Sequence, residues 1–136
     1  MLVRCLYNAR DAIPQEEGRW LDDANFSDAP LEVGQDYLVA GILLYRSVLT
    51  YLVADARLNP VPAPAGLFEI VDGGLPPHWR FAAFDGLRAT GAETLDRPLQ
   101  AMWGYDELVE NSRHLEALFE FDENALVSFR SQILSG

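Results

Sequence analysis

Two histidines and a single cysteine are the side chains best suited to chemistry in this chain, and His78 follows the carboxylates Glu69 and Asp72. Carboxylates and a histidine can share acid–base work when burial moves their pKa values apart. Residues three apart on a strand point to opposite faces of a sheet, so Glu69 and Asp72 are not expected to converge. We interpret Glu69 as a solvent-facing strand residue and Asp72 as a turn residue. A small enzyme that uses Glu69, Asp72 or His78 therefore ranks third, after the two binding functions described at the end of this section.

The remaining reactive groups form no catalytic or metal-binding pattern. A nucleophile needs a positioned base, but the sequence has neither a G-x-S-x-G elbow nor a glycine-rich nucleotide fingerprint, and Cys5 is expected to pack as a small apolar residue. A lone cysteine excludes an intrachain disulfide and a cysteine-based zinc site. Glu110 precedes His114 by one helical turn, but no second ligand pair accompanies it. The sequence therefore predicts no enzyme, no metal and no cofactor.

Charge is the most informative bulk property. The net charge is −11 over 136 residues, and every basic residue except the two histidines is an arginine. Such a surface repels nucleic acids and anionic membranes, because both are bound through basic patches. It attracts a basic partner and speeds the encounter with it. The alternative interpretation is that the charge serves solubility alone.

The N-terminus and the cysteine content indicate a cytoplasmic protein. Arg4 interrupts the first apolar residues, so the start of the chain does not resemble a signal peptide. No apolar run approaches the length that a membrane-spanning helix needs. The length fits one domain of ordinary size.

Strands are predicted through the first three quarters of the chain. Alternating and apolar runs place them at residues 2–7, 37–45, 48–54, 67–71, 79–84 and within 98–104. The first would be a first or edge strand, the second and third a hairpin, and Asp72, Gly73 and Gly74 a sharp turn. Prolines before Gly66 exclude a central strand and favour an extended loop. Residues 11–36 are expected to form a long acidic loop.

Helices are predicted at the C-terminal end. Apolar spacing indicates helix from Tyr105, with a break near Asn111, and a last helix that Asp122 caps. Strands first and helices last indicate one α+β domain, mainly β over 1–104 and helical over 105–136. The expected fold is a bent antiparallel sheet, or a partly open SH3-like barrel, with the C-terminal helices packed on it.

Aromatic and acidic residues near the predicted strand ends are the candidates for a binding surface. Aromatic residues at such positions are either core anchors or interface hot spots. Acidic residues in the first turns of a helix complement its dipole and form a negative patch. The candidate partner-binding residues are Trp103, Tyr105, Asp106, Glu107, Glu110, Glu69 and Asp72.

Four motifs over residues 32–84 carry a family resemblance. They are V-G-x-x-Y-x-V from Val33, Y-L-V-x-D from Tyr51, L-F-E-I-V-D from Leu67, and Trp79 after a proline turn. With these motifs the chain resembles small bacterial immunity proteins, which are encoded beside polymorphic or contact-dependent toxins and bind the toxin. The resemblance implies a cytosolic inhibitor, and the charge adds that a basic nuclease toxin would suit it. The alternative is a small SH3-like adaptor that binds a peptide or protein partner.

Overall fold

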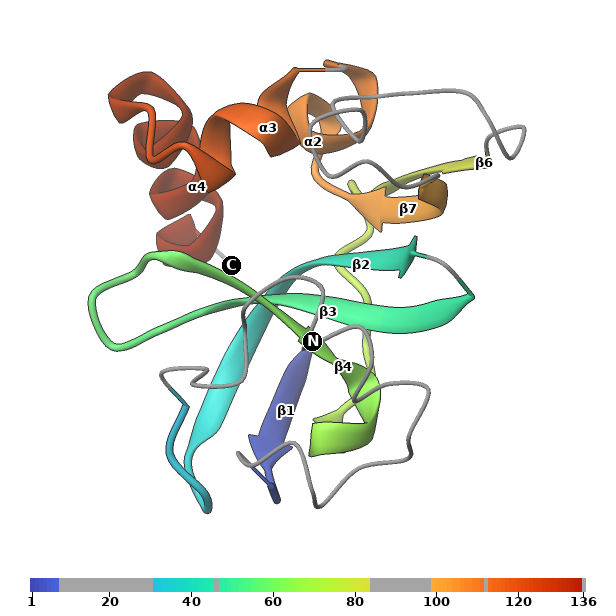
Figure 1. The fold of residues 1–136 in the computed structure, drawn as a ribbon, viewed down its shortest axis with the longest axis vertical. Coiled ribbons are helices and arrows are strands. Elements are labelled where there is room, and N and C mark those ends of the chain that lie inside the picture. The colour runs from blue at the N-terminus through green and yellow to red at the C-terminus, as the bar shows by residue number, and fades with distance from the viewer. Residues whose placement is uncertain (8–30, 46, 84–98, 112, 136) are drawn as a thin grey trace.

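The computed structural model describes residues 1–7, 31–45, 47–83, 99–111 and 113–135. It is an α+β fold in which an open antiparallel sheet carries helices from the C-terminal part of the chain (Figure 1). The expected sheet with C-terminal helices is confirmed. Most of the expected acidic loop, residues 11–30, lies outside the described residues.

Strand β2 (Asp36–Tyr45) organises the sheet. It pairs along one side with β3 (Val48–Ala54), and on its other side with β1 (Leu2–Cys5) near its start and β7 (Leu99–Gly104) toward its end. Register shifts along β2 mark irregular pairing, which bends and twists a strand. On one side, the first part of β2 therefore pairs with β1 and the last part pairs with β7.

Three further strands complete the sheet. β4 (Pro60–Pro64) pairs with β3, β5 (Phe68–Asp72) pairs with β1, and β6 (Arg80–Ala83) pairs with β7. A 3₁₀ turn, η2 (Ala65–Leu67), joins β4 to β5. The sheet order is β4-β3-β2-β1-β5, with β7 and β6 branching from β2.

The structure corrects two predictions about strands. β1 is the first strand of the chain, which is one of the two predicted alternatives, but it lies between β2 and β5 and so is not an edge strand, and the exposed Tyr7 lies beyond its end. The proline-rich segment is strand β4 rather than a loop. Its prolines alternate with Val61 and Ala63, so the amides on one side remain available to β3, and the prolines fall where an edge strand tolerates them.

A pair of glycines lets α2 (Asp106–Glu110) pack directly on the sheet. Gly41 of β2 faces Gly104 of β7, and a Cβ at either position would lie 2.5 to 2.6 Å from Cδ2 of Leu108. No side chain separates the two strands from Leu108, which is buried. The close approach fixes α2 at the end of β7 and so positions the helix residues described below.

The C-terminal helices follow the predicted pattern. α2 ends before Asn111, α3 (His114–Phe119) follows, and α4 (Glu123–Ser135) begins after Asp122, whose carboxylate accepts the amide of Ala125 at 3.0 Å. The predicted break and cap are confirmed. The buried stripe of α4 also matches the prediction and consists of Ala125, Leu126, Phe129 and Ile133.

The core lies where the helices meet the sheet. Large side chains from both layers are almost completely buried there, which is the arrangement that stabilises an α+β domain. These side chains are Val3, Leu52, Val53, Leu67, Leu99, Met102, Tyr105, Leu108, Leu115, Leu118 and Phe129. Trp79, at the corner before β6, is half-buried against them.

Candidate partner-binding surfaces

One arginine bridges two acidic residues of α2. Nε of Arg80 lies 2.8 Å from Oδ1 of Asp106 and 3.0 Å from Oε1 of Glu110, one helical turn further on. The hydrogen bond with Asp106 and the charges of both carboxylates raise the pKa of Arg80. All three side chains are exposed, so salt screens the cluster. The predicted acidic patch is therefore partly neutralised by a residue from β6.

Two aromatic rings are paired one residue further along the same two strands, where side chains point to the other face of the sheet from Arg80. Phe81 of β6 faces Trp103 of β7, with the ring centroids 4.4 Å apart, and Phe81 is 54% exposed. Tryptophan, other aromatics and arginine are the side chains that dominate binding energy at protein interfaces. We call Arg80, Phe81, Trp103, Asp106 and Glu110 the aromatic–acidic surface.

Tyr105 is a core residue, so its assignment to a binding surface is wrong. It is 1% exposed, and its hydroxyl lies 2.6 Å from Nε2 of His114, which is 2% exposed. Tyr105 directly follows β7 and is the N-cap residue of α2, and its hydroxyl reaches His114 of α3. A buried tyrosine needs such a partner for its hydroxyl.

The polarity of the Tyr105–His114 hydrogen bond follows from its surroundings. Burial raises the pKa of Tyr105, so the phenol keeps its proton, and with the proton of His114 on Nδ1 the phenol O–H donates a hydrogen bond to Nε2. Burial also lowers the pKa of His114, although the charge of Glu107 opposes this. Nδ1 of the neutral ring carries the remaining proton and lies 3.8 Å from Oε2 of Glu107. Glu107 therefore faces a buried histidine as well as solvent.

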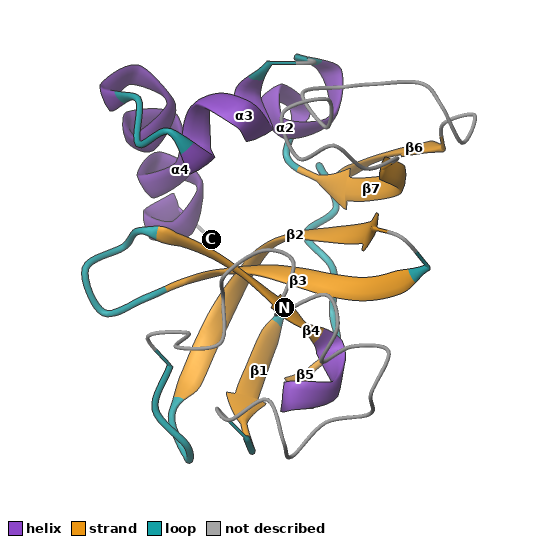
Figure 2. Ribbon diagram, viewed as in Figure 1, coloured by secondary structure: helices purple, strands orange, loops and turns teal. Residues whose placement is uncertain are grey.

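The acidic residues of β5 lie apart from those of α2. Glu69 lies 3.6 Å from Arg4, whereas Oδ1 of Asp72 accepts the amide of Gly74 at 2.9 Å. The predicted turn-setting role of Asp72 is confirmed, and Glu69 is exposed as predicted. β5 lies on the far side of β1 from β2, at the opposite end of the sheet from α2 (Figure 2).

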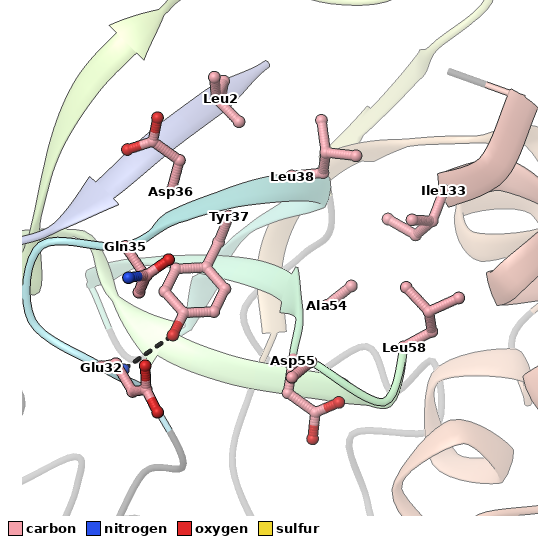
Figure 3. Close-up of a pocket in the computed structure, with 11 residues that line it drawn as sticks. Leu2, Glu32, Gln35, Asp36, Tyr37, Leu38, Ala54, Asp55, Leu58 and Ile133 are labelled. Atoms are coloured by element: carbon pink, nitrogen blue, oxygen red, sulfur yellow. Dashed lines mark hydrogen bonds between the residues drawn. The ribbon is translucent and has the colours of Figure 1, made fainter.

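A groove of about 340 Å³ lies between the start of β2, the β3–β4 turn and the end of α4 (Figure 3). Its lining combines aliphatic and acidic side chains, and among the residues that the structure describes it includes no basic one. The lining residues are Leu2, Glu32, Gln35, Asp36, Tyr37, Leu38, Ala54, Asp55, Ala56, Leu58 and Ile133. We call this feature the acidic groove.

The two sides of the acidic groove differ in chemistry. Figure 3 shows Leu38, Leu58 and Ile133 together on one side, and Glu32 with the Tyr37 hydroxyl on the other. The amide of Glu32 donates to that hydroxyl at 2.7 Å. Asp36 is already paired with Arg4, whose Nε lies 2.8 Å from its carboxylate. The remaining carboxylates of the lining are those of Glu32 and Asp55.

The β3–β4 turn holds the groove open in a fixed shape. Oδ1 of Asp55 accepts the amides of Arg57 and Asn59 at 2.8 and 2.9 Å, and Leu58 has a positive φ of 62°. Leucine adopts this region rarely, so the surrounding bonds hold it there. Arg130 of α4 donates to the carbonyl of Leu58 at 3.3 Å and to the side chain of Asn59 at 2.9 Å.

Sequence reasoning missed the acidic groove. Its walls come from residues near 32, 55 and 133, and no pattern along the chain joins these segments. One signal was present, because Asp36 and Asp55 stand at the outer ends of the apolar strands β2 and β3. Acids at two strand ends that meet in a hairpin would be expected to lie close together.

The reactive residues are separate in the structure. Cys5 is buried, its thiol donates to the carbonyl of Tyr7 at 3.2 Å, and burial raises its pKa, which makes a thiol unreactive. His78 is exposed, and His114 is held by Tyr105. Within the part of the chain that the structure describes, no three His, Cys, Asp or Glu side chains are grouped to hold a metal.

The helices are short. Among the described residues, no helix has both the length and the apolar character needed to cross a membrane. The resemblance to immunity proteins rests on the sequence motifs. Comparison of the chain with family models, with curated protein sequences and with solved structures found no match.

Proposed function

We propose that this protein is a cytoplasmic immunity protein that binds a cognate bacterial toxin domain, a basic nuclease, and neutralises it stoichiometrically. The observation that carries the proposal is the net charge of −11 with no lysine in the chain. A nuclease must attract phosphates, so its active site is basic. Carboxylates on an inhibitor can occupy such a site in place of phosphate oxygens.

Two surfaces of suitable chemistry support the proposal. The aromatic–acidic surface supplies the paired rings of Phe81 and Trp103 and, one residue away on β6, the arginine that bridges two carboxylates, so this region offers both hot-spot side chains and acidic groups. The acidic groove adds a concave site with acidic and aliphatic walls. A basic partner would find contact area and charge complementarity on either surface.

The experiment is co-purification with the C-terminal domain of the protein encoded beside this one. The toxin domain is made in inactive form, captured on the tagged immunity candidate and washed at about 50 mM and about 500 mM salt, because high salt screens surface charge. Titration calorimetry then gives the stoichiometry. We expect a one-to-one complex whose association slows at high salt, and loss of nuclease activity when the active toxin is mixed with this protein.

Two results would contradict the proposal. The first is a toxin domain that stays in the unbound fraction at low salt. The second is full nuclease activity in the presence of excess partner, because binding without inhibition is not immunity.

An SH3-like adaptor that binds a peptide is the second candidate function. The aliphatic wall formed by Leu38, Leu58 and Ile133 favours it, since peptide-binding grooves are mostly apolar with a few polar anchors. This second proposal includes the finer fold prediction, which is a strongly bent small sheet with the strand arrangement of an SH3-like domain. Binding of an extended peptide with little dependence on salt would support the adaptor over the immunity protein.

A further inference from the structure

We infer that the acidic groove is the seat of an arginine side chain that the protein partner presents. The inference rests on the proposed function for the existence of a basic partner, and it names the side chain that the groove accepts. Its first support is the charge of the lining, whose described residues include three carboxylates and no basic side chain. Arg4 offsets the charge of Asp36, so Glu32 and Asp55 supply the net negative charge.

The shape of the groove selects an amphipathic cation. An arginine has an aliphatic stem and a charged head, and such side chains bury the stem along apolar surface while the head reaches polar groups. The stem would lie along Leu58 and Ile133, and the head would reach Glu32 and Asp55 (Figure 3). A volume of about 340 Å³ accommodates one such side chain together with part of a neighbouring residue.

Arginine fits this lining better than lysine does. The guanidinium group offers five N–H donors in a plane and can bond two carboxylates at once, whereas an ammonium is a strongly hydrated point charge. Guanidinium groups also pack against aromatic rings, and the ring of Tyr37 lines the groove next to Glu32. These features favour a planar cation.

The groove is formed without its ligand. The backbone amide of Glu32 donates to the Tyr37 hydroxyl, and the β3–β4 turn is held by the Asp55 carboxylate and by Arg130 of α4. A preformed site loses little conformational entropy on binding. The partner side chain would therefore enter an ordered pocket.

The test uses small probes on the full-length protein, so that it does not depend on the toxin. N-acetyl-arginine amide, its lysine counterpart and the neutral citrulline counterpart are titrated separately while amide chemical shifts are followed. We expect the arginine probe to shift the amides of Glu32, Tyr37, Asp55, Leu58 and Ile133. The lysine probe should bind more weakly, and the citrulline probe should leave these amides in place.

Matched variants connect the shifts to the carboxylates. Glu32→Gln combined with Asp55→Asn removes two charges but keeps the side-chain oxygen that the β3–β4 turn needs. We expect this double variant to bind the arginine probe about threefold to tenfold more weakly, because exposed ion pairs contribute modestly to affinity. Glu120→Gln, an exposed acid at the end of α3, is the control and should leave the affinity unchanged. An unchanged amide spectrum outside the substituted sites shows that the variants fold.

Several outcomes overturn the inference. Equal binding of the arginine and lysine probes would show that the groove has no preference for a guanidinium. Equal binding of the citrulline probe would show that charge does not drive binding. Shifts confined to other surfaces move the site elsewhere. A dimer in sedimentation that the double variant dissolves would place a second copy of this chain in the groove instead of a partner's arginine.

The same variants separate this inference from the proposed function. Capture of the toxin domain with full affinity by the double variant keeps the immunity function and removes the groove from the interface. Arginine-probe binding by a protein that ignores the toxin keeps the groove and removes the immunity function.

Discussion

The aromatic–acidic surface and the acidic groove contain similar residue types in different electrostatic states. In the first, Arg80 lies within 3.0 Å of both Asp106 and Glu110, so one cation already offsets the two acids. In the second, the described part of the lining includes no cation, and Glu32 and Asp55 border a concave space. Net charge alone does not identify a binding site, because the position of the arginines decides which carboxylates still attract a partner.

The two surfaces also depend on different parts of the fold. The aromatic–acidic surface depends on how α2 sits on the sheet, which is set by Leu108 against Gly41 and Gly104. The acidic groove depends on the β3–β4 turn and on the tie from Arg130. Substitutions can therefore disturb one surface and leave the other intact.

The largest expected effect is that of Leu108→Ala. The substitution removes the side chain that packs α2 against the paired glycines. Truncating a buried leucine costs about 2 to 5 kcal/mol. Denaturant unfolding should show this loss of free energy. The amides of the aromatic–acidic surface should lose hydrogen-exchange protection more than those of the acidic groove. Val127→Ala, an exposed position on α4, is the control and should cost less than about 0.5 kcal/mol.

The buried Tyr105–His114 pair gives the next largest effect. Tyr105→Phe removes the hydroxyl and leaves Nε2 of His114 buried without its partner, which should lower the free energy of unfolding by about 1 to 3 kcal/mol. Equal stability of the variant and the natural protein in denaturant would show that the hydrogen bond contributes nothing.

The same pair predicts how stability depends on pH. Burial lowers the pKa of His114 in the folded state, so the unfolded chain binds the proton more readily. The contribution of His114 is fully present above its ordinary pKa of about 6.5 and is lost as the pH falls through the lowered folded value. Stability should fall as the pH drops below about 6.5, and His114→Gln, which keeps an acceptor for Tyr105 but does not titrate, should flatten this fall. An identical slope in both proteins would rule out His114 as the cause.

Local patterns predicted much of this fold. The boundaries of β3, the buried stripe of α4 and the Asp122 cap follow from apolar spacing and from a helix-start signal. The interior position of β1 could not be read in this way, because it depends on β5 reaching back across the sheet. Local patterns also predicted a loop where β4 lies, because an edge strand that alternates prolines with paired residues has the sequence of a loop.

The site was harder to predict than the fold because it depends on pairing between distant segments. Asp106 and Glu110 were correctly placed on one helix face, but the arginine that neutralises them arrives through the pairing of β6 with β7. Tyr105 was misassigned because its position next to an acidic helix start resembles a surface, whereas its hydroxyl has a buried partner. The contact of His114 with Tyr105 and the position of Ile133 in the lining of the acidic groove both depend on the tertiary structure.

Charge reversal compares the two surfaces directly. If the acidic groove receives an arginine of the partner, Glu32→Lys combined with Asp55→Asn, which keeps the oxygen that the β3–β4 turn needs, should slow association with the toxin domain by about tenfold at low salt. Lysines in place of Asp106 and Glu110 should slow it less, because Arg80 already offsets those charges. Stopped-flow association rates at several salt concentrations measure both, and a larger effect at Asp106 and Glu110 would place the aromatic–acidic surface at the centre of the interface.

The smallest effect is expected for Arg80→Met, which makes the aromatic–acidic surface resemble the acidic groove. Removing one exposed arginine should change the free energy of unfolding by less than about 1 kcal/mol, because exposed ion pairs contribute little. It frees Asp106 and Glu110, so association with a basic partner should become faster and more sensitive to salt. Arg113→Met removes an equal charge at another exposed site and is the control for net charge. If the two variants speed association equally, net charge alone sets the rate; if only Arg80→Met does so, the local pairing of carboxylates controls the encounter.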